Sequence, residues 1–446
     1  KDDGWAKRAD IKRAGLMSGA GMVLGQMSGA WSEDVLTYNG SGHVLALGAT
    51  RSGKGRGIVV PTILNWPGSL VVLDPKGELA AGDPRVGFAG TSGFRAQFSH
   101  VQIFAPASSA SARYNPLLEV RRGVNEVRDV QNIVDVLTAP LEASRETPFW
   151  RNAASTLLVG LILDVLYSEA DEHKTFAAVL SRLSRLDDVA EEMRTRLHPL
   201  DGTTYGPHPK VKEAADFYLG MEPRTRSNVL ATAVSYLTLF QDPLVAKNTA
   251  ASDFRLGDLV ALEHPVTLYL QMPPSDAGRL MPLFRIMLGQ ITRALTETLS
   301  HDPLGRMKKH KLLFVLDEFP QLGLLPGFER MLGIMAGYGM QAMLVCQSVN
   351  HIKGVYGRDN VIIDNCDVTT SFTINDPDTA EVISAYAGEI WRSLPQMTQH
   401  DSRRAFEPAR RSITMREEKR PLLLGSEAMR LPSDQMLIFA GDCKPI

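Results

Sequence analysis

The residues whose types and spacing most directly indicate chemistry form a glycine-rich octapeptide, G-A-T-R-S-G-K-G, at positions 48–55. An apolar run at 44–47 precedes it, and the segment 56–64 after it can become helical. In this strand–loop–helix context, the spacing G-x-x-x-x-G-K predicts backbone N–H groups that bind the β- and γ-phosphates of a nucleotide, with Lys54 as a mobile positive charge. The predicted nucleotide-binding residues are Gly48, Thr50, Arg51, Ser52, Gly53, Lys54, Gly55 and Arg56.

The residue after Lys54 departs from the usual pattern, because Gly55 stands where a Ser or Thr hydroxyl normally binds Mg²⁺. Thr50, Ser52 or a water molecule can supply the missing ligand, since Mg²⁺ usually keeps several waters. We therefore expect phosphate binding to persist and hydrolysis to be slower or dependent on a partner.

A second motif is an apolar run at 312–316 followed by Asp317 and Glu318, the Walker B arrangement. A buried strand would hold Asp317 at its carboxyl end, where the carboxylate binds Mg²⁺ directly or through water. Glu318 can polarise the attacking water as a general base. An Asp-Glu pair is common by itself and can be a solvated strand end, so it indicates a nucleotide site only in combination with the phosphate loop upstream. Together the motifs predict a nucleoside triphosphate site with Asp317 as the metal ligand and Lys54 and Glu318 as catalytic residues.

A third apolar run, 342–345, leads to Gln347. A glutamine at the end of a strand beside the Walker B strand can contact the γ-phosphate or the attacking water, although such a residue can also cap a loop. We predict that Gln347 is a third catalytic residue.

Four further charged residues are weaker candidates. Asp74 follows the apolar run 70–73 and can line the nucleotide cleft, because ligands bind outside the carboxyl ends of parallel strands. Lys76 can contact phosphate or form a surface ion pair. Arg330 and Arg358 are candidates for an arginine finger by their position after the Walker B strand, and both also fit ordinary surface charges.

Length and composition indicate a soluble globular protein of two or three domains. The chain has 446 residues, with 44% hydrophobic and 22% charged content, which excludes a disordered protein. The net charge of −2 excludes an overall basic field, so nucleic acid would have to bind a local surface such as a pore lining. The 3 cysteines are far apart in the sequence and no zinc-binding spacing occurs. This pattern favours thiols that are buried or have no chemical role, in a reducing compartment.

Apolar runs of strand length recur through most of the chain. Several are apolar throughout, which is typical of parallel strands covered on both faces, so we predict a doubly wound α/β sheet. The runs are 44–47, 70–73, 101–104, 266–270, 312–316, 342–345, 370–374 and 436–439.

Between residues 149 and 247 the strand-like runs stop and helical periodicity dominates, which predicts an all-α insertion. We predict a nucleotide-binding domain in two parts, 1–165 and 226–446, around an all-α domain at 166–225. The boundaries of the all-α domain are placed to within about 20 residues.

No apolar run reaches the roughly 18 residues that a membrane helix needs, and the run 157–166 contains Asp164, which indicates a core helix. The first residues are basic, as in a chain trimmed just inside a membrane anchor, although an ordinary solvated start fits equally well. The polar and basic segment 396–420 predicts an exposed excursion before the final strand.

With these motifs in place, the chain resembles the TraG-like (VirD-type) coupling proteins of type IV secretion systems over nearly its whole length. The motifs that carry the resemblance are T-R-S-G-K-G at 50–55, V-P-T at 60–62, V-L-D-P-K-G-E at 72–78, Y-N-P-L at 114–117, F-W at 149–150, L-D-E-F-P at 316–320, A-G-Y-G at 336–339, C-Q-S at 346–348 and R-P-L-L at 420–423.

The resemblance implies a RecA-like α/β P-loop domain, with a mostly parallel twisted sheet, that carries an inserted all-α domain. It implies ATP and Mg²⁺ as cofactors, with Lys54, Asp317, Glu318 and Gln347 at the family's nucleotide positions and Gly55 as a form that many members share. It also implies an amino-terminal membrane anchor, absent from this chain, and a location at the cytoplasmic face of a bacterial inner membrane.

The implied function is that of a hexameric ATPase that recruits substrates and delivers them to a type IV secretion channel, as in conjugation. The implied partners are further copies of the chain, a relaxase–DNA complex or effector proteins, secretion components of the inner membrane, and single-stranded DNA. The alternative is a nucleotide-switched receptor or adaptor for protein effectors with little motor activity. Because an anchor concentrates subunits in two dimensions, we expect the isolated chain to be monomeric or weakly associated.

Overall fold

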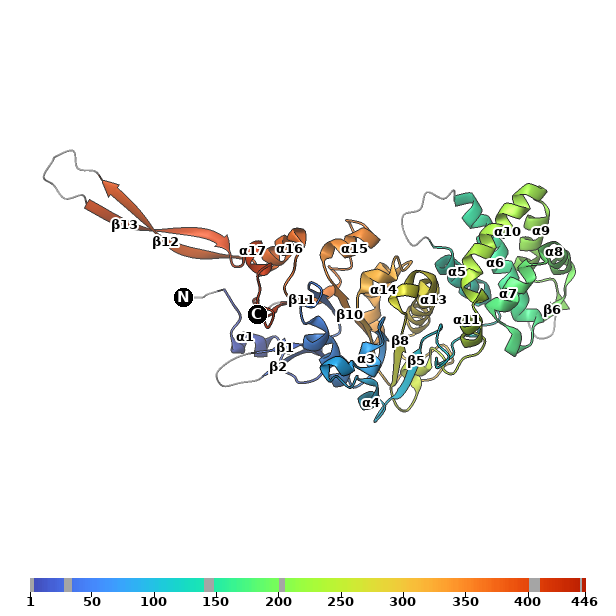
Figure 1. Ribbon diagram of the computed structural model, residues 1–446, viewed down its shortest axis with the longest axis horizontal. Helices are drawn as coiled ribbons and strands as arrows, with labels where there is room; N and C mark the ends of the chain where they lie inside the picture. Colours follow the sequence, from blue (N-terminus) through green and yellow to red (C-terminus); the bar gives the residue numbers. More distant parts are fainter. Residues whose placement is uncertain (1–3, 28–33, 140–147, 200–204, 401–409, 442) are drawn as a thin grey trace.

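The computed structural model describes residues 4–27, 34–139, 148–199, 205–400, 410–441 and 443–446. Its centre is a sheet of eight strands in the order β14-β11-β3-β10-β9-β4-β8-β5 (Figure 1). All neighbouring strands are parallel except β11 and β14, which are antiparallel. The strands are β3 (His43–Leu47), β4 (Ser69–Leu73), β5 (His100–Phe104), β8 (Val266–Leu270), β9 (Leu312–Leu316), β10 (Met340–Cys346), β11 (Cys366–Ser371) and β14 (Leu437–Ala440).

Each of the eight predicted apolar runs contributes to this sheet, which confirms the α/β fold class. The run 370–374 is the least accurate, because β11 starts at Cys366 and ends at Ser371. The cause is the composition of this strand: Thr369 and Thr370 are buried, and hydroxyl residues at buried positions do not stand out in an apolar pattern.

Successive side chains of each strand point to opposite sides of the sheet, and an apolar cluster covers each side. Leu45 and Phe314 enter one apolar cluster, whereas Val44 and Val315 enter the other. The first cluster includes side chains from α5 (Glu126–Leu137), α13 (Ala277–Leu295) and α14 (Phe328–Met335); the second includes side chains from α1 (Arg8–Arg13), β1 (Met22–Gln26), β2 (Val35–Tyr38) and α2 (Val60–Asn65).

The remaining helices outside the connection between β5 and β8 are short. They are η1 (Gly55–Val59), α3 (Glu78–Ala81), η2 (Pro84–Val86), α4 (Ser92–Arg95), η3 (Pro116–Glu119), η6 (Pro274–Asp276), η7 (Phe319–Leu322), η8 (Ala336–Tyr338), α15 (Val349–Tyr356), α16 (Pro377–Ala387) and α17 (Gly425–Ala428).

The connection between β5 and β8 is helical, as the loss of strand-like runs predicts, and most of it forms a bundle at one end of the molecule (Figure 1). The predicted domain boundaries stay predictions; both fall inside helices, α6 and α10. The elements are α6 (Pro148–Ser168), η4 (Asp171–His173), α7 (Phe176–Leu183), α8 (Leu186–Thr195), β6 (His198–Pro199), β7 (Tyr205–Gly206), α9 (Pro209–Leu219), α10 (Pro223–Leu237), η5 (Thr238–Gln241), α11 (Pro243–Asn248) and α12 (Asp258–Ala261).

Helix α6 is the central helix of this bundle. Within the described parts of the chain it is the one helix that is long and apolar enough to cross a membrane, so the expectation that no segment reaches this length is wrong, although 67% of its apolar window is buried inside the protein. Asp164 lies within it and is fully buried. This environment confirms the prediction of a core helix from the run 157–166.

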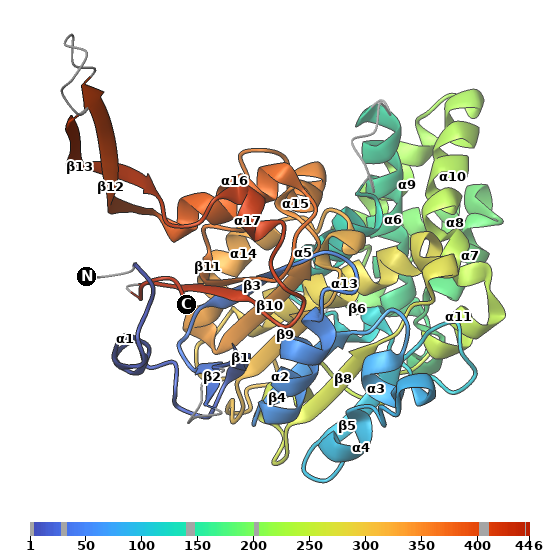
Figure 2. The same cartoon turned by 60° about the vertical axis from the view of Figure 1, so that its left-hand side comes forward.

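The polar segment before the last strand forms a two-stranded antiparallel ribbon, β12 (Glu389–His400) and β13 (Arg410–Pro421). The ribbon projects from the sheet at the end opposite the helical bundle (Figures 1 and 2), and Trp391 on it is exposed. The prediction of an exposed excursion is therefore confirmed for the described residues, while Arg403 and Arg404 lie outside them.

Candidate active site

The order of the strands brings the predicted catalytic residues to one edge of the sheet. Strands β3, β10, β9 and β4 are consecutive and parallel, so their carboxyl ends meet there. The register pairs Leu47 with Cys346 and Leu344 with Leu316. The phosphate loop, Gln347 and the Asp317–Glu318 pair consequently follow three adjacent strands.

The phosphate loop is anchored at its start and exposed at its tip. Gly48 N–H donates to Cys346 O at 3.2 Å and Ala49 N–H donates to Thr373 O at 2.8 Å. Arg51 and Gly53 have positive φ, 62° and 96°, a conformation that glycine adopts freely and arginine rarely does. The chain then enters η1, a π-helical turn that continues into α2, so the prediction of a helix over 56–64 is confirmed.

Lys54 connects the loop with the acidic residues. Its side chain is buried, and Nζ donates to Ala49 O at 3.0 Å and to Gly48 O. Burial lowers the pKa of Lys54, and the nearby carboxylates of Glu318 and Asp317 oppose that shift. The ammonium group therefore lies in the field of both Walker B acids, where it can meet phosphate oxygens.

Asp317 and Glu318 have different environments although they are adjacent. Asp317 accepts the Glu318 N–H at 3.0 Å, and its pKa is raised to about 6 by burial and by the Glu318 charge, with Lys54 opposing. Glu318 adopts a left-handed conformation, φ 51° and ψ 43°. Such strain in a residue other than glycine costs of order 1–3 kcal/mol and is concentrated at functional sites.

Gln347 is hydrogen-bonded to Glu318. Its Nε2 donates to the two carboxylate oxygens of Glu318 at 3.2 and 3.3 Å. The structure thus brings Lys54, Asp317, Glu318 and Gln347 together as the sequence predicts, and it adds that the amide of Gln347 orients the carboxylate of Glu318.

The surroundings of Gly55 fit a Mg²⁺ site that lacks the usual hydroxyl. A Cβ atom built on Gly55 would meet no atom within 4 Å. The Ser52 hydroxyl is buried and has no hydrogen-bond partner, whereas Thr50 is exposed. No group of three His, Cys, Asp or Glu side chains in the described residues could hold a metal ion. Asp317 stays the predicted protein ligand for Mg²⁺, which accepts waters for its other positions.

Asp74 and Lys76 have structural partners. The register pairs Leu73 with Leu316, which places Asp74 beside Asp317. The buried Asp74 carboxylate accepts the N–H groups of Leu79 at 3.1 Å and Ala80 at 2.9 Å, so it anchors α3. Lys76 is exposed and lies 3.4 Å from Glu78, the surface ion pair that was one of its two interpretations.

The two candidate arginine fingers are on the surface. Arg330 in α14 and Arg358 after α15 are both exposed. An arginine finger acts on a nucleotide bound by a neighbouring subunit, so the two residues stay candidates.

Two features of the site have no signal in the sequence. The first is a groove of about 1550 Å³ beside the loop, lined by Gly53, Arg56, Gly57, Phe372 and Met436 among others. A Cβ atom on Gly57 would lie 3.2 Å from the ring of Phe372, so the loop helix and this aromatic ring are in close contact. The apolar run 370–374 contains Phe372 but does not indicate that it adjoins the phosphate loop.

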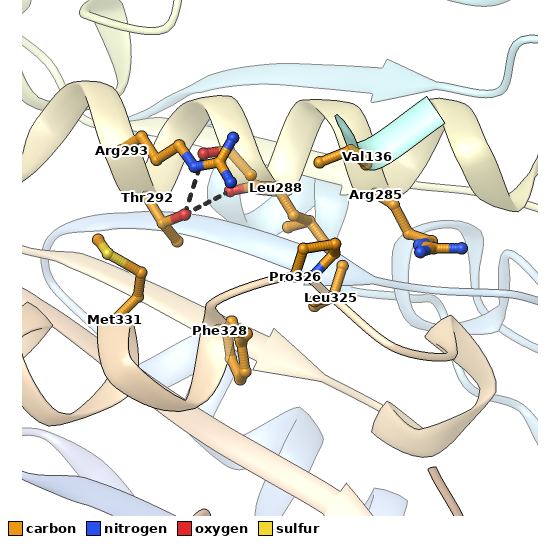
Figure 3. A pocket seen from close by; sticks show the side chains of 10 residues that line it. Val136, Arg285, Leu288, Thr292, Arg293, Leu325, Pro326, Phe328 and Met331 are labelled. Atoms are coloured by element: carbon orange, nitrogen blue, oxygen red, sulfur yellow. Dashed lines mark hydrogen bonds between the residues drawn. The ribbon is translucent and has the colours of Figure 1, made fainter. Parts of the chain in front are cut away.

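The second is the packing of the segment after Glu318. Figure 3 shows Leu288 and Thr292 of α13 facing Leu325, Pro326 and Phe328. Arg285 of α13 lines the same pocket, and its Nε and Nη2 are buried without hydrogen-bond partners. Burial lowers the pKa of Arg285. The segment 325–328 therefore packs beside a buried guanidinium, two nitrogens of which have no hydrogen-bond partner.

Comparison with known proteins assigns the family. Residues 4–446 match the family model for type IV secretory system conjugative DNA transfer. The chain is 37% identical to a conjugal transfer protein TraG of Escherichia coli over 476 aligned positions, covering 98% of this chain and 73% of the relative. It is 26% identical to the protein VirD4 of Agrobacterium fabrum, covering 99% of this chain and 64% of the relative.

The fold is also that of a solved coupling protein. The unbound monoclinic form of the bacterial conjugative coupling protein TrwBdeltaN70 superposes with a TM-score of 0.66 at 16% identity, covering 98% of this chain and 90% of that chain. TrwB in complex with ADP and Mg²⁺ gives a TM-score of 0.64 at 15% identity, covering 99% and 91%. With its RecA-like sheet, its helical insertion and its phosphate loop, the chain belongs to the family of type IV secretion coupling proteins of conjugative DNA transfer.

Proposed function

We propose that this protein hydrolyses ATP to drive the delivery of substrates, relaxase-bound single-stranded DNA or effector proteins, to a type IV secretion channel. The observation that carries the proposal is the convergence of Lys54, Asp317, Glu318 and Gln347 at one sheet edge beside a phosphate loop. TrwB has been solved in complex with a non-hydrolysable ATP analogue and with ADP and Mg²⁺, which supports the same nucleotide and ion here.

Each residue has a distinct task in this mechanism. The backbone N–H groups of the loop and Lys54 bind the β- and γ-phosphates, and the groove beside Phe372 receives the nucleoside. Asp317 would hold Mg²⁺, which when bound neutralises phosphate charge. Glu318 accepts the proton of the attacking water, and Gln347 keeps the Glu318 carboxylate oriented.

The assembly and location follow from family membership and stay proposals. Subunits would form a hexamer at the cytoplasmic face of the bacterial inner membrane, in contact with inner-membrane components of the secretion system. In such a ring Arg330 or Arg358 would reach the nucleotide of the next subunit. The missing hydroxyl at Gly55 and the need for this arginine both favour slow hydrolysis in an isolated subunit.

The test is ATP turnover of the protein with and without single-stranded DNA. We expect DNA to raise turnover, and Lys54→Ala to abolish both the basal and the stimulated rate. A lack of any DNA effect, with effector proteins changing turnover instead, would favour the alternative of a nucleotide-switched receptor for protein cargo. Turnover that survives Lys54→Ala would contradict the assigned site.

A further inference from the structure

The helical insertion contains a buried polar cluster that the nucleotide site does not use. It joins α5, α6, the end of α8 and the start of α9; α6 packs against α5 and α9, and α8 packs against α9. Its titratable centre consists of Glu126, Asp164, His198 and His208, and each of these residues is at most 5% exposed. Two histidines and two carboxylates buried this completely must be held by a specific set of hydrogen bonds.

The first imidazole bridges the chain before α9 to α6. His198 Nδ1 accepts the N–H of His208 at 3.2 Å, so the ring proton is on Nε2, which donates to Asp164 Oδ1 at 3.1 Å. Asp164 also accepts from Arg196 at 2.7 Å and pairs with Arg182. Because two guanidinium groups already balance this carboxylate, burial and these arginines lower the pKa of His198.

The second imidazole caps α9 and bridges it to α5. His208 Nδ1 accepts the N–H of Lys210 at 3.2 Å, and Nε2 donates to Glu126 Oε1 at 3.0 Å. Tyr167 O–H also donates to Glu126, at 2.7 Å, and Arg122 lies 3.6 Å from the same carboxylate. Burial lowers the pKa of His208, with Glu126 opposing.

The outer side of the cluster is acidic. Glu169 pairs with Arg182 at 2.7 Å, and Glu192 pairs with Arg196. These two carboxylates hold the arginines and do not contact either imidazole. Among the residues that the structure describes, the charges that face His198 and His208 are those of Asp164, Glu126 and three arginines, and the two imidazoles also face each other.

A proton on Nδ1 of either ring turns an acceptor into a donor that faces a backbone N–H. At His208 this change also removes the cap of α9 and places positive charge at the helix N-terminus, where the helix dipole disfavours it. We propose that His198 and His208 form a proton-operated latch, which holds the start of α9 against α5 and α6 when both rings are neutral and releases it when either ring is protonated.

The test is amide hydrogen exchange of the full chain at pH 7.5 and pH 5.5, corrected for the intrinsic exchange rate. If a histidine regains an ordinary pKa of about 6.5 when α9 is released, the equilibrium constant for opening is about tenfold larger at pH 5.5 than at pH 7.5. Peptides that cover the start of α9 should show at least this loss of protection, while peptides from β9 and β10 should not.

Variants separate the latch from general acid sensitivity. In the double variant His198→Gln, His208→Asn, the asparagine can still cap α9 and neither residue titrates, so the pH effect on α9 should vanish. His264→Gln removes an exposed histidine and should leave the effect intact. An unchanged α9 at pH 5.5, or an equal pH effect in the double variant, would overturn the proposal.

If the double variant does not fold, a measurement on the histidines of the wild-type protein tests the latch instead. Deuterium exchange at the imidazole C2 carbon reports the protonation of each histidine. His198 and His208 should take protons only below the ordinary histidine pKa of about 6.5, and α9 protection should fall as they do so. Protonation of both rings without loss of α9 protection would contradict the latch.

Discussion

Gln347 donates through Nε2 to the two carboxylate oxygens of Glu318, at 3.2 and 3.3 Å. The amide comes from the end of β10 and the carboxylate from the end of β9, so the pairing of these two strands sets the contact. The orientation of the proposed general base therefore depends on a neighbouring strand, and not on the Walker B strand alone.

Gln347→Ala should lower kcat for ATP by about 10²-fold, because general base catalysis is typically worth at least that much and the freed carboxylate loses its orientation. The KM for ATP should change little, since the amide of Gln347 is hydrogen-bonded to the proposed base and not to a group that binds phosphate in this mechanism. Steady-state turnover measures both constants. Gln131→Ala, at an exposed glutamine of α5, is the control and should have no effect; a loss confined to KM would contradict the assigned role.

Glu318→Asn should abolish turnover while raising the free energy of unfolding by about 1 kcal/mol. Asparagine tolerates the left-handed conformation that strains Glu318, so the substitution relieves strain and removes the base. Glu318→Gln is the matched control, because it removes the base and keeps the strain. Urea unfolding and ATP turnover test the pair, and equal stability of the two variants would show that the strain is not significant.

Gly55→Ser should raise the Mg²⁺ affinity of the nucleotide-bound protein several-fold. The space around a Cβ at this position is open, and the new hydroxyl can supply the ligand that the usual motif contains. Gly55→Ala adds the same Cβ without the hydroxyl and should leave the affinity unchanged. Calorimetric titration of Mg²⁺ into the ADP complex is the measurement, and equal gains from Ser and Ala would refute the explanation.

His43→Gln should weaken the pH dependence of stability. His43 Nδ1 accepts the Ala342 N–H at 3.0 Å and its Nε2 donates to Leu332 O at 2.7 Å, and burial lowers its pKa. In the unfolded chain His43 binds a proton with an ordinary pKa of about 6.5, whereas in the folded chain it does so only at lower pH. Its contribution to the free energy of unfolding is therefore fully present above about pH 6.5 and is lost as the pH drops below that value.

The effect of His43 is at most one proton, or about 1.4 kcal/mol per pH unit in that window. Urea unfolding between pH 5 and pH 8 gives the slope for wild type and variant. Identical slopes would show that His43 is protonated in the folded protein as easily as in the unfolded chain.

Arg285→Met should raise the free energy of unfolding by about 2 kcal/mol, because it replaces a buried charge, two nitrogens of which lack a hydrogen-bond partner, with an unbranched apolar side chain. Arg293, which lines the same pocket (Figure 3), provides the contrast: its Nη1 donates to Asn132 O at 3.2 Å, so Arg293→Met should destabilise the protein. Thermal unfolding distinguishes the two, and destabilisation by both substitutions would show that Arg285 has a partner in solution.

The sequence by itself determined the eight strands of the main sheet and the family, and it predicted the catalytic residues. The eight apolar runs form strands because a parallel sheet that is buried on both faces requires continuous apolar segments. Such segments can be recognised in the amino-acid sequence alone. The spacing around Lys54 and the Asp317–Glu318 pair likewise depends on local geometry. For this reason those residues could be assigned before any contact was known.

The tertiary structure alone decided how these parts are related. Strand order places β10 between β3 and β9, which brings Gln347 to Glu318, and no local pattern records strand order. The packing of Phe372 against Gly57, the unpaired Arg285 and the pairing of His198 and His208 with buried carboxylates join residues that are far apart in the chain. Such contacts arise from how whole elements pack, so only the folded chain reveals them.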